Sequence, residues 1–175
     1  MKVINTKVLL NNLLEIYSLL FVLFLTNSCS TTLRKEINSA FEKTKRIEIL
    51  AYIDRNQWDE EDNSNYSKLN YIKNGNLEIN KKYLKNRIIL NEEQIEILKK
   101  RLSKCEIENW GAKCYNPRHA ILFYDKNDKI YGYIEMCFDC NGSESSENFK
   151  AFSGCALGLK ETLKEFGITY FNEGK

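Results

Sequence analysis

The strongest structural signal of the chain lies between Cys114 and Gly142, in the stretch CYNPRHAILFYDKNDKIYGYIEMCFDCNG. Two apolar runs, rich in aromatic and β-branched residues, flank the polar residues 125–129. Runs of this composition favour β-strands, and a short polar segment between them favours a turn. We therefore predict an antiparallel β-hairpin over residues 119–138.

The register of this hairpin decides which side chains meet. If Tyr124 pairs with Ile130 across the turn, His119 lies opposite Glu135. His119 is the only histidine of the chain, and we expect it to hydrogen-bond to Glu135 rather than to take part in catalysis. In the same register the cysteines gather at the end of the hairpin away from the turn.

A further strand is predicted over residues 46–54, where every second residue is apolar, the period of a half-buried strand. Residues 55–65 are acidic and turn-prone and predict an exposed loop around an isolated Trp58. This acidic loop lacks the glycine and the distal glutamate of an EF-hand, so we expect it to be solvated rather than to bind calcium.

Three more candidate strands follow at residues 66–72, 76–79 and 84–90. Asn74-Gly75 stands between the first two and is typical of a two-residue hairpin turn. These strands and the hairpin together predict a small antiparallel sheet.

Two helices are expected to pack against this sheet. Asn91 and Gln94 have the spacing of a capping box, which predicts a helix over residues 92–104. A second helix is predicted near 154–166, with Gly167 as its left-handed stop. The fold class expected from the sequence is therefore α+β.

The N-terminal residues have the pattern of a secretion signal. The apolar run 16–25 is too short to cross a bilayer core of about 30 Å as a helix and fits a signal peptide better. We expect residues 1–28 to be this signal, Cys29 to become the lipidated N-terminus, and residues 29–45 to be a tether. Residues 46–175 are then one globular domain.

The residues around the expected cleavage site resemble a lipobox, in which a small residue precedes the lipid-bearing cysteine. Ser28 precedes Cys29, while Leu25 lies one place further back than in the strict pattern and Thr26 takes its position. This looser form is similar to that of Bacteroidota lipoproteins. The resemblance implies a membrane partner reached through the lipid, and the lack of an acidic cluster after Cys29 implies a periplasm-facing location.

Composition excludes some partners. The chain has 43% hydrophobic and 29% charged residues with a formal net charge of +2, which is ordinary for a packed domain. Such a balance gives no strong attraction to nucleic acid, so we expect no nucleic-acid partner. The sequence also has no nucleotide-binding loop and no Ser-His-Asp order.

The hairpin resembles a family of bacterial proteins of unknown function. In this family a Cys-x-x-Pro-Arg-His segment precedes a strand, a turn, a second strand and a Cys-Phe-x-Cys. The matching residues are Cys114, Pro117, Arg118, His119, Cys137, Phe138 and Cys140. The resemblance covers about thirty residues. It implies that these residues form a functional site, but it implies no particular activity.

The cysteines allow several kinds of chemistry. In an oxidising compartment, Cys114 is expected to form a disulfide with Cys140 or Cys137, or with Cys105. Apart from the lipid-bearing cysteine, five of the six cysteines remain, so at least one of these five must be unpaired within the domain. Cys155 is the fifth, and the connectivity stays open.

Two alternatives use the same residues. Cys137 and Cys140 are spaced as half of a zinc site, which Cys114 with His119 or Cys155 would complete. Alternatively one of these thiols is redox-active or nucleophilic, and a thiol can also stay buried and reduced. We expect no cofactor, with zinc as the alternative.

The function expected from these features is that of a non-enzymatic envelope lipoprotein that binds an unknown envelope protein or ligand or has a structural role. We assign no catalytic residue. The alternative is a thiol- or zinc-dependent activity at the cysteine end of the hairpin. Arg118 is expected to pair with Asp139 or Glu135.

Overall fold

The computed structural model describes residues 28–59, 71–104 and 115–171. The compact unit that carries the cysteine hairpin runs from Ile37 to Lys175. The C-terminal end of helix α2, Ser28–Glu42, belongs to this unit. In the described part of the chain, no helix combines the length and apolar character needed to cross a membrane.

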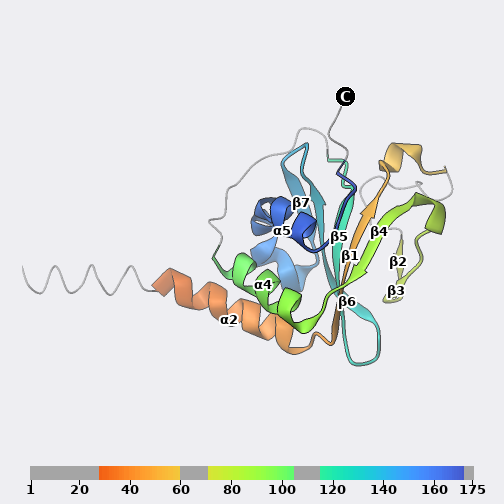
Figure 1. The fold of residues 1–175 in the computed structure, drawn as a ribbon. Helices are drawn as coiled ribbons and strands as arrows, with labels where there is room; N and C mark the ends of the chain where they lie inside the picture. Colours follow the sequence, from red (N-terminus) through yellow and green to blue (C-terminus); the bar gives the residue numbers. More distant parts are fainter. Residues whose placement is uncertain (1–27, 60–70, 105–114, 172–175) are drawn as a thin grey trace, which may run out of the picture. The chain divides into compact units, whose positions relative to one another are not determined.

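A five-stranded antiparallel sheet forms the centre of this unit (Figure 1). Its strand order is β4-β1-β5-β6-β7, and every neighbouring pair is antiparallel. The strand bounds are Arg46–Tyr52 for β1, Leu84–Ile89 for β4, His119–Tyr124 for β5, Ile130–Cys137 for β6 and Gly142–Ser145 for β7. The α+β class predicted from the sequence is confirmed.

The strand β1 differs from the half-buried strand that alternation predicts. All its residues after Arg46 are buried, because β1 lies between β4 and β5 and both faces of the sheet are covered. Its apolar residues at every second position therefore face one layer, while Leu50 and Tyr52 face another.

Helical segments cover one face of the sheet (Figure 1). They are α4, Glu92–Ser103, the 3-10 segments η3, Glu147–Phe152, and η4, Gly154–Leu159, and α5, Lys160–Glu165. Phe149 stacks on Phe123 at a centroid distance of 3.9 Å, and Phe41 from the end of α2 lies edge-on to Phe123 at 5.5 Å. These aromatic contacts form the core beneath the sheet.

The opposite face is covered by a small two-stranded sheet and by connecting segments. Its strands are β2, Ile72–Lys73, and β3, Asn76–Leu77, and two 3-10 turns lie nearby, η1, Arg55–Gln57, and η2, Lys81–Tyr83. Asn74 and Gly75 both have positive φ, at 51° and 73°, as a type I′ hairpin turn requires. The turn signal read from the sequence is confirmed.

Both predicted helices are present. The capping box of Asn91 and Gln94 forms, and α4 buries Leu98 and Leu102. The second helix is less regular than predicted, because residues 154–159 are 3-10 and only the last part is α-helical. Gly167 adopts φ +102° and ends the segment as expected.

Three predictions about connecting segments need correction. Trp58 is 6% exposed and stacks on Tyr83 at 4.6 Å, so the start of the predicted exposed loop is part of the core. No strand was predicted after Cys140, but β7 pairs there with β6. Ile37 and Phe41, assigned to the tether, are buried because they lie against the helical core.

Candidate functional site

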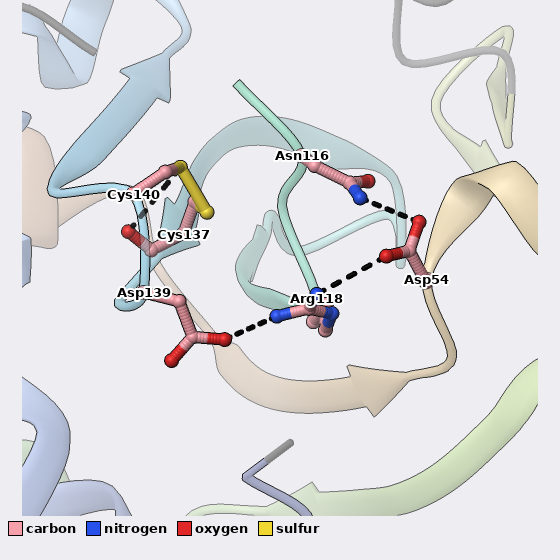
Figure 2. The surroundings of a disulfide bond; sticks show 6 residues. All are labelled: Asp54, Asn116, Arg118, Cys137, Asp139 and Cys140. Carbon is pink, nitrogen blue, oxygen red and sulfur yellow. Dashed lines mark hydrogen bonds and ion pairs between the residues drawn. A yellow bond between two sulfur atoms is a disulfide. The ribbon is translucent and has the colours of Figure 1, made fainter. Parts of the chain in front are cut away.

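The sulfurs of Cys137 and Cys140 form a disulfide across the turn between β6 and β7, with a Cα–Cα distance of 5.4 Å. Figure 2 shows this bridge beside the side chain of Asp139. Cys137 is the last residue of β6 and pairs with Gly142 in β7. The turn closes because Asn141 takes a left-handed conformation with φ 49°.

This pairing corrects the predicted disulfide between Cys114 and Cys140 or Cys137. Those two sulfurs bond to each other, so neither is available to Cys114. A bridge between residues three apart closes a very small loop, and loop closure of this size is worth about 2 kcal/mol in the unfolded state. The bridge therefore contributes little to the stability of the domain as a whole.

Arg118 connects the disulfide turn to the end of β1 (Figure 2). Its guanidinium forms ion pairs with Asp139, which lies between the two cysteines, and with Asp54 at 3.1 Å. Asn116 also donates a hydrogen bond to Asp54. Burial alone would raise the pKa of Asp54, but these hydrogen bonds outweigh it and hold the pKa below its ordinary value. The predicted contact of Arg118 with Asp139 is confirmed.

His119 is buried, with 3% of its surface exposed. Its Nε2 lies 2.8 Å from the carbonyl oxygen of Tyr170. A carbonyl oxygen can only accept, so Nε2 carries the proton and donates a hydrogen bond to this oxygen. The ring packs between Phe171 at 4.7 Å and Phe138 at 5.0 Å. Burial lowers the pKa of His119 to about 4, against the opposing effects of the Tyr170 carbonyl and of Asp139.

The predicted hydrogen bond between His119 and Glu135 is wrong. Tyr124 pairs with Ile130 as expected, but the register shifts by one residue beyond that pair, and His119 lies opposite Met136. A one-residue shift moves side chains to the other face of a sheet. Glu135 therefore points into the layer opposite to that of His119.

Four of the seven residues on which the sequence resemblance rests line one small pocket: Arg118, His119, Cys137 and Phe138. Its lining combines aromatic, cationic and sulfur-bearing side chains with one carboxylate: Arg118, His119, Cys137, Phe138, Asp139, Lys160 and Phe171. The Nδ1 atom of His119 is buried and has no hydrogen-bond partner among the described residues. Because the ring is neutral and Nε2 is the donor, Nδ1 is a free acceptor.

The contributions of Tyr170 and Phe171 to this site were not predicted. Both lie after the last helix, in a segment without strand or helix periodicity. Only the aromatic character of Phe171 was available as a signal, and it does not distinguish a core contact from a surface one.

A second polar cluster lies in the opposite layer and was also missed. The carboxylate of Glu135 is 1% exposed and accepts hydrogen bonds from Tyr52 and Tyr71, each at 2.6 Å. Arg55, 3% exposed, forms an ion pair with the same carboxylate. Burial, and then the charge of Glu135, raise the pKa of both tyrosines well above the ordinary value. The cluster is a buried ion pair whose carboxylate also accepts hydrogen bonds from two phenolic hydroxyls.

The remaining candidate residues are Cys155, Pro117 and the cysteines at positions 29, 105 and 114. Cys155 is disulfide-bonded and 3% exposed, so it is not a free reactive thiol. Pro117 is buried. The predictions for Cys105 and Cys114 lie outside the described residues, and those for the side chain of Cys29 stay predictions.

The zinc alternative also stays a prediction. Among the described residues, no group of three or more histidine, cysteine or acidic side chains is arranged to hold a metal ion. With the Cys137–Cys140 bridge closed, these two sulfurs offer no thiolate ligand.

The fold and the site define an α+β domain with a five-stranded antiparallel sheet and a disulfide at one strand turn. Comparisons with protein-family models, with curated proteins and with solved structures find no match.

Proposed function

We propose that the protein is an envelope lipoprotein, anchored in a membrane through a lipid on Cys29, whose domain faces the periplasm. The observation that carries this proposal is the disulfide chemistry of the domain. The Cys137–Cys140 bridge and the disulfide at Cys155 need an oxidising compartment to persist. A signal-like apolar run that ends just before Cys29 supplies a route to such a compartment.

We propose that the domain has a binding or structural role rather than an enzymatic one. The side chains at the pocket support this role because they mainly hold segments of the chain together. Arg118 links Asp54 to Asp139, and His119 links β5 to the C-terminal segment through Tyr170. Among the described residues, Ile89 is the only large hydrophobic side chain that is strongly exposed, so the partner surface we propose is polar.

The lipid anchor is tested by metabolic labelling. Cells that express the full chain are fed radiolabelled palmitate, and the protein is immunoprecipitated from membrane and soluble fractions. We expect label and membrane association with the wild type and loss of both with Cys29→Ser. Cys114→Ser serves as the matched control and should keep its label. Continued labelling of Cys29→Ser would overturn the proposal.

A second candidate function is thiol chemistry at the Cys137–Cys140 bridge. It is favoured by the weak stabilisation expected from so small a loop and by the greater exposure of Cys140 than of Cys137.

A further inference from the structure

The two residues of the Cys137–Cys140 bridge differ in their exposure to solvent. Cys137 ends β6 and is 3% exposed, whereas Cys140 lies in the turn and is only half-buried. A thiolate that attacks a disulfide approaches one sulfur in line with the S–S bond, and the other sulfur leaves. Because Cys140 is the more exposed of the two residues, we expect attack at its sulfur.

We propose that Cys137–Cys140 is a thiol–disulfide exchange site at which Cys140 is the attacked sulfur and Cys137 the leaving one. This inference rests on the second candidate function, to which it adds the order of attack, and it does not depend on the lipid anchor. The reducing partner is a thiol or dithiol. The bridge lies in the turn that holds Asp139 against Arg118 and Phe138 against His119.

The exchange proceeds in two steps. The thiolate of the first thiol forms a bond to the sulfur of Cys140, the bond between Cys140 and Cys137 breaks, and its electron pair leaves with Cys137, which takes up a proton. A second thiol then attacks the mixed disulfide, which releases Cys140 as a thiol and leaves the two reductant molecules joined. The protein bridge gains two electrons and two protons, and the two thiols lose them.

The surroundings of the bridge accommodate the reduced form. The turn is also held by the pairing of Cys137 with Gly142 and by the ion pair between Arg118 and Asp139, so it keeps its position when the S–S bond opens. The sulfur of Cys140 lies 3.7 Å from the carbonyl oxygen of Cys137, which is an acceptor for the thiol that reduction creates.

The pocket beside Cys137 offers a second acceptor. The Nδ1 atom of His119 is buried without a hydrogen-bond partner among the described residues, and both His119 and Cys137 line this pocket. Reduction therefore adds an S–H donor to the wall of a pocket that already holds an unpaired acceptor.

The first experiment maps where the mixed disulfide forms in the wild-type full chain, purified in detergent without reductant. The protein is treated briefly with glutathione, quenched with acid and N-ethylmaleimide, and digested for peptide mass spectrometry. We expect glutathione on Cys140 and maleimide on Cys137, with about tenfold or greater preference for this arrangement. Equal labelling, the reverse arrangement, or no opening of the bridge before denaturation would overturn the proposal.

A second experiment compares two variants that both lack the bridge. Cys137→Ser leaves a thiol at Cys140, and Cys140→Ser leaves one at Cys137. With oxidised glutathione we expect Cys140 to form its mixed disulfide at least about tenfold faster than Cys137. Faster reaction of Cys137 would contradict the assigned order. The wild-type mapping decides the question if either variant fails to fold, and neither result depends on the state of Cys29.

Discussion

The ionisation of His119 is coupled to folding because its imidazole is buried and neutral. Its pKa is about 4 in the folded protein, against about 6.5 in an unfolded chain. Asp139, Arg118 and Lys160 are the charged groups that act on it, and the carboxylate opposes the two cations. The unfolded state therefore binds a proton that the folded state excludes between these two pH values.

We predict that this histidine makes the domain less stable in mild acid. Its contribution is fully present above pH 6.5 and is lost as the pH falls toward 4, because the folded-state pKa is lowered. Between pH 7.5 and pH 5 the free energy of unfolding should fall by about 2 kcal/mol from this residue alone. Urea unfolding of the wild type and of His119→Gln at both pH values measures the difference, which should be much smaller in the variant.

We predict that removing one partner of the buried ion pair between Arg55 and Glu135 strongly destabilises the domain. Glu135→Gln leaves the cation of Arg55 buried without its counter-charge and should lower the free energy of unfolding by about 3–5 kcal/mol. The double variant Arg55→Met, Glu135→Leu should be less destabilised than Glu135→Gln, because it buries no charge. Denaturant unfolding of the three proteins tests this order, and a double variant less stable than the single one would contradict it.

The elements of the fold were more predictable than their register. Hairpin β5–β6, the capping box of α4 and the turn at Asn74-Gly75 follow from local patterns, which the sequence displays directly. The one-residue shift between Phe123 and Tyr124 does not. It depends on Tyr131, the extra residue of β6, whose hydroxyl donates a hydrogen bond to the carbonyl oxygen of Ala40. That contact joins residues far apart in the chain.

This shift also explains which parts of the site the sequence predicted. Cys137, Cys140, Arg118 and His119 were identified by residue type and spacing, whereas their partners depend on the register. Arg118 reaches Asp139 because both lie near the open end of the hairpin in either register. His119 instead turns to the layer that contains Phe171, a residue without a distinguishing local pattern.

Gly132 in β6 has a specific packing role. It pairs with Phe123, and a Cβ atom at this position would overlap the ring of Phe149 that stacks there. We predict that Gly132→Ala lowers the free energy of unfolding by about 1–3 kcal/mol through overpacking. Gly158→Ala is the matched control, because a Cβ there meets no atom within 4 Å. Equal unfolding midpoints for the two variants would show that the aromatic layer tolerates the added methyl group.

For the whole molecule, the disulfides define the state in which the chain should be isolated. Cys137 and Cys140 form one bridge, and Cys155 is in another. We predict a denatured, oxidised mass about 4 Da below that of the fully reduced chain, since each bridge removes two hydrogens. The double variant Cys137→Ser, Cys140→Ser should show about half this difference. Intact-mass spectrometry after export to an oxidising compartment measures both values.

The packing of side chains indicates where the domain begins. The end of α2 belongs to the compact unit, because Ile37 is 1% exposed and Phe41 packs against Phe123 and Phe149. A chain of residues 46–175 loses these side chains and should be destabilised by about 5 kcal/mol or more, which is comparable to the whole stability of many domains.

A chain of residues 28–175 that carries Cys29→Ser keeps the end of α2 and should unfold cooperatively, near the midpoint of the full-length protein. Circular dichroism during thermal unfolding separates the two truncations. Equal midpoints would mean that the domain begins at residue 46 and that α2 is only a tether. A large loss confined to the shorter chain would mean that the last turns of α2 are part of the core. A shorter segment than residues 29–45 would then connect the domain to the proposed membrane anchor.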